Sequence, residues 1–209
     1  YNRSTNYMYY LWPGVLSAVL QQVMLLALAL SFASEFENGT FSQLVQKSNS
    51  IVQMMSVKII PYLVMSFGVW LIYWFFTFYF RIPFFTNLPQ LTFVAGIFIL
   101  SVSFIGILVS ILIPNQLKAT EILMVIATPS FILSGFSWPL SQMPNWVQGV
   151  ANIIPLTHFL KAFRILIIEE GTLSQVQNPI YNMIIIGIVC AILSYIALYF
   201  KSKKALQST

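Results

Sequence analysis

Very few residues in this sequence carry groups that could do chemistry. All five acidic residues among the 209 are glutamates, and the chain has one histidine, His158, and one cysteine, Cys190. A serine–histidine–aspartate arrangement cannot form, because the chain contains no aspartate. A lone histidine with no cysteine near it in the sequence does not make a metal site. The sequence therefore predicts neither catalysis by such groups nor a bound metal. Cys190 falls within an apolar stretch, where it is expected to be a small packing residue.

Nucleotide chemistry has no motif in this chain. The sequence lacks a loop of the form Gly-x-x-x-x-Gly-Lys-Ser/Thr and lacks an acidic cluster for a metal–phosphate complex. If ATP drives the function, its binding site must therefore belong to another chain. We expect no catalytic residues and no cofactor here, with ATP and magnesium bound by a partner subunit.

The composition is that of an integral membrane protein. Hydrophobic residues make up 58% of the chain and charged residues only 7%, whereas soluble domains have about 25% charged residues. Each uncharged stretch is long enough for one membrane-spanning helix of about 20 residues. These stretches are residues 4–34, 59–80, 82–117, 122–160 and 171–200. They do not resemble the short alternating segments of a transmembrane β-barrel.

We therefore expect an all-α integral membrane protein with five transmembrane helices, forming one domain over residues 1–209. The expected spans are residues 10–33, 59–80, 91–113, 121–133 and 179–200, and the fourth is expected to bend near Pro129. Lysine and arginine favour the cytoplasmic side. Three lysines follow the last span directly: Lys201, Lys203 and Lys204.

That lysine cluster places the C-terminus in the cytoplasm, and five spans then place the N-terminus outside. In this orientation six basic residues lie inside and four outside, and the four outside include Arg3 and Arg81. Residues 1–10 lack the basic and apolar regions of a signal peptide. We therefore expect the sequence to be a fragment of a longer subunit with a further span upstream.

The first internal loop contains two glutamates, Glu35 and Glu37, close to the end of the first span. Gly39 permits a sharp change of chain direction, and Thr40 is a candidate N-cap for a short helix over residues 41–47. The apolar residues of this helix recur at helical spacing on one face. The loop could be a lipid-surface helix, a simple connector or a docking element for a soluble partner. The paired carboxylates favour the last, because they suit an anionic lipid surface poorly.

The stretch 122–160 is too long for one span and too short for two. Proline and glycine interrupt it, and Pro144 and Pro155 suit the first turns of two short helices, over about residues 144–152 and 155–168. In the second helix Thr157 and His158 are expected on the polar arc with Lys161 and Arg164. The prediction is a re-entrant or interfacial helical hairpin over residues 137–170, on the outer side.

The charged and titratable residues of this hairpin allow more than one interpretation. His158 is expected to have a structural role such as hydrogen bonding at a helix end, rather than handling protons. Lys161 and Arg164 either reach the lipid headgroups, which is the simpler interpretation, or bind an anionic group of a substrate. Glu169 and Glu170 are expected as their neighbours at a solvated helix end.

Few residues within the spans could contact a polar substrate. Gln21 and Gln22 lie near the middle of the first span, and the second span is rich in aromatic residues, including Trp74 and Phe78. An aromatic wall suits a hydrophobic or amphiphilic substrate, and it suits lipid contact or dimer packing equally well. These four residues are the candidate substrate path.

Several of these motifs together resemble the ABC-2 type permeases, the membrane subunits of ATP-driven exporters. The first is Glu35-x-Glu37-x-Gly39-Thr40 followed by Leu44, which is similar to the family's first cytoplasmic loop. Further similar stretches, in the same order as in the family, are Leu11-Trp12-Pro13-Gly14, Lys58-Ile59-Ile60-Pro61-Tyr62, residues 134–144, and residues 155–160 with Arg164. The resemblance covers nearly the whole chain.

The resemblance implies a role for two groups of residues. A coupling helix, about residues 35–47, would dock into a cytoplasmic ABC ATPase subunit through Glu35, Glu37, Gly39, Thr40, Phe41 and Leu44. The hairpin would close the outer end of the pathway through Gly135, Trp138, Pro139, Met143, Pro144, Pro155, His158 and Arg164. This sequence departs from the family in two places: the stretch after the coupling helix lacks the usual proline, and Val57 stands where the family usually has glycine before Lys58.

The resemblance also implies the wider setting. It predicts the C-terminal portion of a six-span permease subunit in a bacterial inner membrane, paired with a second copy or a paralogue. Such a subunit would move a drug, a lipid or a glycoconjugate outward, and it would have no nucleic-acid partner. Whether a periplasmic adaptor also binds stays open. The alternatives are an ion-coupled secondary transporter, which usually needs ionisable groups within the membrane, and a membrane assembly scaffold.

Overall fold

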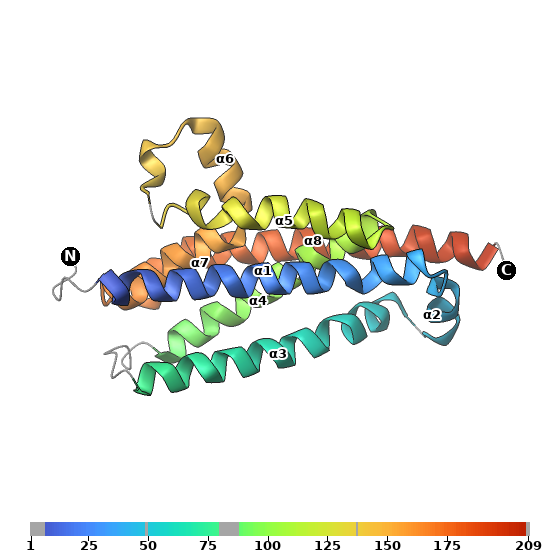
Figure 1. Ribbon diagram of the computed structural model, residues 1–209, viewed down its shortest axis with the longest axis horizontal. Coiled ribbons are helices and arrows are strands. Elements are labelled where there is room, and N and C mark those ends of the chain that lie inside the picture. Colours follow the sequence, from blue (N-terminus) through green and yellow to red (C-terminus); the bar gives the residue numbers. More distant parts are fainter. Residues whose placement is uncertain (1–6, 49, 80–87, 137, 208–209) are drawn as a thin grey trace.

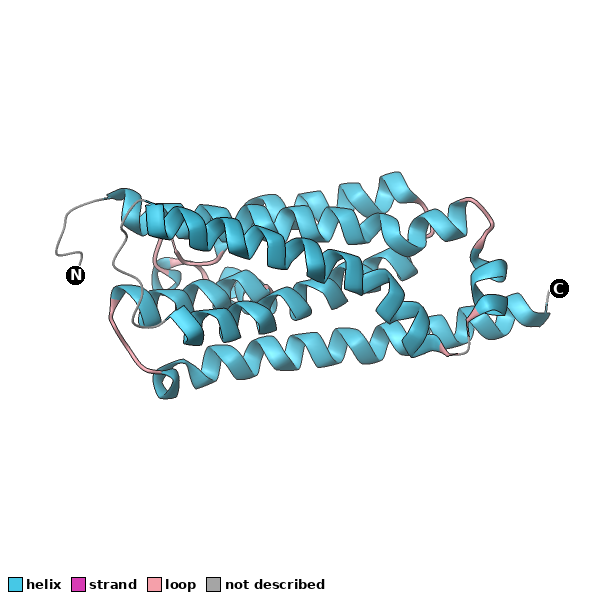
Figure 2. Cartoon of the chain, turned by 90° about the horizontal axis from the view of Figure 1, so that it is seen from below, coloured by secondary structure: helices cyan, strands magenta, loops and turns pink. Residues whose placement is uncertain are grey.

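A computed structural model describes residues 7–48, 50–79, 88–136 and 138–207, and in these residues every regular element is a helix (Figure 2). Arg3, Arg81, Phe80 and Ser137, which entered the sequence predictions, lie outside the described residues. The long helices are α1 (Tyr7–Glu37), α3 (Ile51–Tyr79), α4 (Leu88–Leu112), α5 (Gln116–Leu133) and α8 (Gln177–Gln207). Five helices of the described chain are long and apolar enough to cross a membrane. This confirms the expected all-α membrane fold.

The helices extend beyond the spans that the uncharged stretches suggested. Helix α3 begins at Ile51 rather than at residue 59, and α5 begins at Gln116 rather than at residue 121. The absence of charge marks the apolar part of a helix, whereas the helix itself continues through Lys58, whose ammonium has a carboxylate partner. In α5 the first turns carry the exposed Lys118 and Glu121, and the helix runs on through Pro129 to Leu133.

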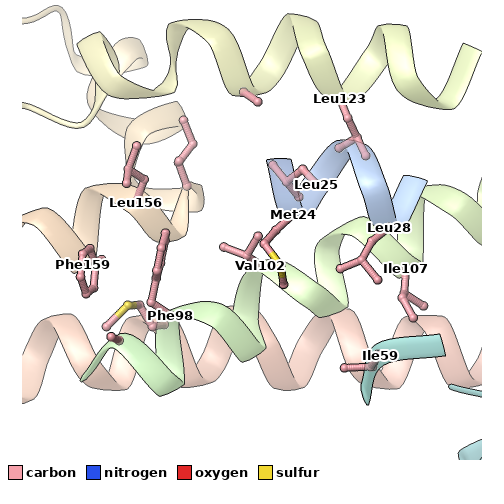
Figure 3. Close-up of a cluster of buried hydrophobic side chains, with 14 of the residues drawn as sticks. Met24, Leu25, Leu28, Ile59, Phe98, Val102, Ile107, Leu123, Leu156 and Phe159 are labelled. Carbon is pink, nitrogen blue, oxygen red and sulfur yellow. The ribbon is translucent and has the colours of Figure 1, made fainter. Parts of the chain in front are cut away.

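Helix α4 forms the centre of the bundle. In the most apolar segment of α4, 56% of the residues are buried, whereas the corresponding share in α3 is 17%. Small residues allow close approach on both sides. A Cβ on Gly106 would lie 2.7 Å from Cβ of Leu28 in α1, and Ser101 Oγ donates a hydrogen bond of 2.8 Å to the carbonyl of Met183 in α8. Figure 3 shows buried side chains of α4, including Phe98 and Ile107, together with those that α1, α3, α5 and α7 pack against them, including Leu28, Ile59, Leu123, Leu156 and Phe159.

The two ends of the bundle hold different short helices (Figure 1). The α2 end contains α2 (Phe41–Lys47) and the last turns of α8. The hairpin end contains α6 (Asn145–Ile153), α7 (Pro155–Phe163) and the first turns of α1. Every described long helix runs between these two ends. Continuous helices could therefore transmit a displacement from one end to the other.

The hairpin consists of two helices with different surroundings. Helix α6 and the helix formed by α7 with its π-helical continuation (Arg164–Ile168) meet at an angle of 88°. Helix α6 projects from the bundle beside α5 (Figure 1) and exposes Trp146 and Ile153. Helix α7 lies inside the bundle against α4 and α8. Short 3-10 turns at Leu140–Gln142 and Leu173–Val176 complete the connections before and after it.

Candidate functional site

The site at the α2 end is built around the last turn of α1. Glu35 extends from this turn, and its Oε1 lies 2.6 Å from Nζ of Lys58 in α3. Its other carboxylate oxygen accepts a hydrogen bond from the hydroxyl of Thr40, directly before α2. Thr40, the residue at the N-cap position, makes no side-chain cap bond to α2. One carboxylate therefore connects α1 to α3 and to the start of α2, and the expected capping role of Thr40 is replaced by this contact.

Glu37 has a different partner from Glu35. Its Oε2 accepts a hydrogen bond of 2.9 Å from the backbone N–H of Gln116, the first residue of α5. The first N–H groups of a helix have no partner within that helix, and a negative charge near them is favourable. Asn115 caps the same helix by accepting from the N–H of Lys118 at 2.9 Å. Both glutamates of the predicted loop thus have partners within the chain, and Glu37 is also exposed, so its expected contact with a soluble partner stays a prediction.

Helix α2 covers Phe41–Lys47, the residues that the spacing predicted, whereas residues 35–37 of the expected coupling helix belong to the end of α1. Phe41 is buried and its ring centroid lies 4.5 Å from that of Phe36 in α1. Leu44 and Val45 are partly buried against the core. The apolar face of α2 therefore turns inward, and the exposed side is polar, formed by Gln43, Gln46 and Lys47. Phe41 and Leu44, predicted as docking residues, lie on the face that packs against the bundle.

Gly39 makes the turn between α1 and α2. Its φ angle is +70°, which side chains other than glycine seldom adopt, and a Cβ there would meet no atom within 4 Å. The requirement for glycine at this position is therefore conformational and not steric. The sequence predicted a sharp redirection here, and the positive φ confirms it.

The predicted hairpin residues lie at the opposite end and do not gather into one cluster. Gly135 has a φ angle of +77°, and a Cβ there would lie 2.5 Å from Cγ of Leu140, so the loop closes tightly. Pro144 directly precedes α6, and Pro155 is the first residue of α7, as expected. Trp138 and Pro139 are exposed, whereas Met143 is half-buried and its carbonyl accepts from the side chain of Gln148 at 2.9 Å.

Thr157 and His158 do not lie on a polar arc of the second helix, so the prediction from the sequence was wrong. Both are buried, with exposures of 2% and 4%. Nε2 of His158 lies 2.8 Å from the carbonyl of Asn152 in α6, and Nδ1 lies 3.5 Å from Nδ2 of Asn182 in α8. The imidazole thus connects α6, α7 and α8. A wheel drawn for a helix with one buried face fails here, because α7 is surrounded on most sides.

The two cations of the hairpin remain at the surface. Lys161 and Arg164 are both exposed, and Nε of Arg164 lies 3.3 Å from Oε1 of Glu169. The two residues are five positions apart, the spacing of hydrogen-bonded residues in a π-helix. The N–H of Glu169 indeed donates a hydrogen bond of 3.0 Å to the carbonyl of Arg164. Glu169 is thus a neighbour of Arg164, as expected, through π rather than α geometry.

The residues of the predicted substrate path are scattered. Gln21 is buried, and its Nε2 donates a hydrogen bond of 3.0 Å to Ser130 Oγ in α5. Gln22 is half-buried. Trp74 and Phe78 are 45% and 66% exposed on the outside of α3, where they would meet lipid. These four residues therefore do not line a common path within this chain.

An apolar cavity of about 400 Å³ lies elsewhere, toward the hairpin end. Its walls come from α1, α3, α4 and α7, and include Leu20, Val69, Trp70, Phe98, Phe159 and Phe163. The floor residues Phe98, Phe159 and Phe163 are buried, whereas Val19 and Ile72 at its edge are about half exposed. Sequence reasoning missed this cavity, because only the embedding of α7 brings Phe159 and Phe163 next to α1 and α3.

Comparison with known proteins gives a consistent result. The family model of the ABC-2 family transporter proteins matches residues 1–196. The probable multidrug ABC transporter permease YbhR of Escherichia coli K12 is 27% identical over 195 residues, which cover 89% of this chain and 51% of that protein. YbhS of the same organism, with the same description, is 26% identical over 166 residues, 78% of this chain and 44% of that protein.

A more distant relative is the ABC transporter G family member 20 of Dictyostelium discoideum, 25% identical over 172 residues, 78% of this chain and 22% of that protein. The chain thus spans about half the length of the Escherichia coli relatives that it matches. No solved structure matches it. The family match over nearly the whole sequence agrees with the five apolar helices of the described chain and with the resemblance of its loop motifs. The chain is a multi-pass membrane protein that belongs to the ABC-2 family of transporter proteins.

Proposed function

We propose that this chain is the membrane-spanning part of an ATP-driven exporter and that a separate ABC ATPase docks on α2. The observation that carries the proposal is the attachment of α2. Glu35 joins the start of α2 to α1 and α3, Glu37 fixes the start of α5, and the exposed face of α2 remains polar. A helix attached in this way can transmit a movement from a soluble partner to three spans. ATP and magnesium would bind in that partner, not in this chain.

We further propose that the α2 end faces the cytoplasm and the hairpin end faces outward, in a bacterial inner membrane. Lys201, Lys203 and Lys204 lie at the α2 end, as positively charged cytoplasmic flanks would. A membrane-impermeant thiol reagent tests this on single cysteines in a Cys190→Ala background. A cysteine at Gln142 or Glu170 should react from outside, and one at Gln46 or Ser202 only after permeabilisation. If Gln142 and Ser202 reacted from the same side, the proposed topology would be wrong.

The substrate is proposed to be hydrophobic or amphiphilic, as a drug, a lipid or a glycoconjugate would be. The cavity beside α1 and α3 supports this class, because its volume of about 400 Å³ lies within the range of ligand sites and its walls are apolar. The two Escherichia coli relatives are described as probable multidrug transporters. Replacing Trp70 by alanine should raise the substrate concentration needed for half-maximal transport, whereas replacing the outward-facing Trp74 should leave it unchanged.

The functional unit is proposed to be a dimer of permease subunits, with the first turns of α1 near the interface. Val15 and Val19 in this segment are 38% and 50% exposed, so they are available for such a contact. Single cysteines at these positions should crosslink in membranes that contain active complex. A lack of crosslinks at every position from 14 to 22 would count against this arrangement.

The docking proposal is tested on the complete permease subunit co-expressed with its ATPase. A cysteine at Gln43, on the exposed face of α2, should crosslink to the ATPase, whereas a cysteine at Leu44, on the packed face, should not. Inverted vesicles should then take up a fluorescent hydrophobic dye when ATP is added. Uptake driven by a proton or sodium gradient without ATP would instead support an ion-coupled transporter.

A further inference from the structure

Lys201 differs from the other lysines near the end of α8. Lys203 and Lys204 are exposed, whereas Lys201 is half-buried and its side chain turns inward. Its ammonium donates a hydrogen bond to the carbonyl of Ile111, near the end of α4. The same ammonium lies 3.9 Å from the centre of the Phe36 ring in α1. From the sequence, Lys201 is recognisable only as a positive charge at a cytoplasmic flank.

Each contact of Lys201 has a clear physical basis. Helix α4 ends at Leu112, so the Ile111 carbonyl belongs to the last turn, where carbonyl groups lack partners within the helix. A cation is favourable there because the C-terminal end of a helix carries partial negative charge. An ammonium over an aromatic face at this distance makes a cation–π contact. Lys201 therefore joins the end of α4 to α1 while belonging to α8.

The Phe36 ring carries this contact on to α2. Its centroid lies 4.5 Å from that of Phe41, the first and buried residue of α2. Helix α2 also packs directly against α8. A displacement of α2 would thus move Phe41 against Phe36, and Phe36 against the lysine that fixes the ends of α4 and α8.

A second lysine approaches α1 one helical turn away. Nζ of Lys58 lies 5.9 Å from the ring of Phe32, four residues before Phe36 and therefore on the same side of α1. Lys58 from α3 binds the Glu35 carboxylate, and Lys201 from α8 binds a helix end. The two lysines connect α1 to different spans at the same level of the bundle.

We propose that Lys201 is a positioning residue that couples α2 to α4 and α8, so that a movement imposed on α2 by the ATPase reaches these two spans. The proposal rests on the proposed role of α2 as the ATPase docking helix. It explains why one lysine of the cluster turns inward, whereas a lysine that only binds anionic lipid would be expected to extend outward as Lys203 and Lys204 do.

The experiment uses the complete permease subunit and its ATPase in vesicles, with substrate transported and ATP hydrolysed both measured. Lys201→Met keeps most of the aliphatic side chain and removes the charge and the donor. Transport per ATP should fall about threefold to tenfold, the factor expected for one charge-assisted hydrogen bond at a partly exposed site. Lys201→Arg, which keeps a cationic donor, should retain at least half of the wild-type ratio. Lys203→Met is the matched control and should leave the ratio unchanged.

A second measurement follows the contact itself in the permease alone. A spin label on a cysteine at Gln43, in a Cys190→Ala background, should become more mobile in Lys201→Met and keep its mobility in Lys203→Met. The proposal is overturned if Lys201→Met preserves both the transport ratio and the label mobility, or if Lys203→Met changes them equally. If the wild-type complex showed no ATP-driven transport, the proposed function would fail, and the spin label alone would still decide whether Lys201 positions α2.

Discussion

The two ends of the bundle secure their short helices in different ways. At the α2 end Phe41 is the one residue of α2 that is buried, and charged groups make the connections to α3 and α5. At the hairpin end α7 is buried without interruption from Pro155 to Leu160, and its Phe159 ring stacks on Phe98 of α4 at 4.5 Å. Helix α2 therefore lies on the bundle, whereas α7 is part of its core.

This difference sets how each end can move. Apolar packing at α7 is close, so displacing the helix would open a cavity and lose many contacts together. The polar contacts at α2 are few and directional. The two groups of such a contact can move together without opening a gap in the core. The α2 end is therefore suited to receive a movement, and the hairpin end to remain in place beside the apolar cavity.

Removing the Phe159 ring should destabilise the protein most. Phe159 is 3% exposed and stacks on Phe98 beside the apolar cavity, so Phe159→Ala removes this stacking contact and enlarges the cavity. We expect a loss of about 2–4 kcal/mol in the free energy of unfolding, below the largest values for soluble cores because lipid is as apolar as the core. Circular dichroism of the complete subunit in mild detergent, recorded during heating or denaturant titration, measures this free energy of unfolding.

The control for Phe159 is Phe93→Ala. Phe93 is a phenylalanine in α4 with 58% exposure, and its loss should change stability little. Equal losses for both variants would contradict the assignment of α7 to the core.

Reversing the charge of Glu35 should have the next largest effect. Glu35→Lys places two ammonium groups together where a carboxylate now lies 2.6 Å from Lys58. With both side chains about one-fifth exposed, the cost to attaching α2 is about 2 kcal/mol, above that of a surface pair. Transport per ATP should fall, while helix content of the bundle remains. Lys58→Glu added to this variant should restore much of the ratio, and failure of this swap would indicate that the Thr40 contact matters more.

The extent of α2 could be read from the sequence because its signals are local. Gly39 and the spacing of Phe41, Leu44 and Val45 suffice to predict a short helix after a turn, and the helix observed has those bounds. The spans were also found, but their starts were set too late in α3 and α5. A charged residue marks where lipid contact ends, but it does not end the helix. Helix α3 continues through Lys58, which is paired with Glu35, and α5 continues through Lys118, which is exposed.

The surroundings of α7 could not be read in the same way. The sequence predicts the prolines that begin the hairpin helices, but a wheel cannot show that α1, α4, α5 and α8 enclose α7. This is why His158 was expected on a polar face and is buried with Asn152 and Asn182 as its partners. The aromatic residues of α3 are a related case. Trp74 and Phe78 are exposed, while the cavity is lined by Trp70, one helical turn before Trp74 in the same helix.

Substitutions at Gly39 test the effect of backbone strain at the α2 end without a change in packing. Its φ is +70° and the space around it is open, so a substitution there acts through the backbone alone. Gly39→Val should cost about 1–2 kcal/mol in this left-handed conformation, whereas Gly39→Asn, a residue that adopts it more readily, should cost less. We expect transport per ATP to fall clearly in the valine variant and slightly in the asparagine variant. Equal behaviour of the two would mean that the turn is not held in this geometry during transport.

The smallest effect is expected at Glu37, the connection between α1 and α5. Its carboxylate accepts from the N–H of Gln116 at 2.9 Å in an exposed position, and Asn115 provides a second cap for the same helix. Glu37→Ala should therefore weaken the start of α5 by about 0.5–1 kcal/mol, the lower part of the range for helix caps. Hydrogen exchange of the first amides of α5 should become faster, while amides of α7 remain unchanged. Glu37→Gln keeps an oxygen acceptor, so the exchange rates of these α5 amides should lie between those of the wild type and those of the alanine variant. If exchange accelerated equally in α7, the two ends would not be held independently, and the contrast between a polar attachment at α2 and an embedded α7 would not describe how this bundle moves.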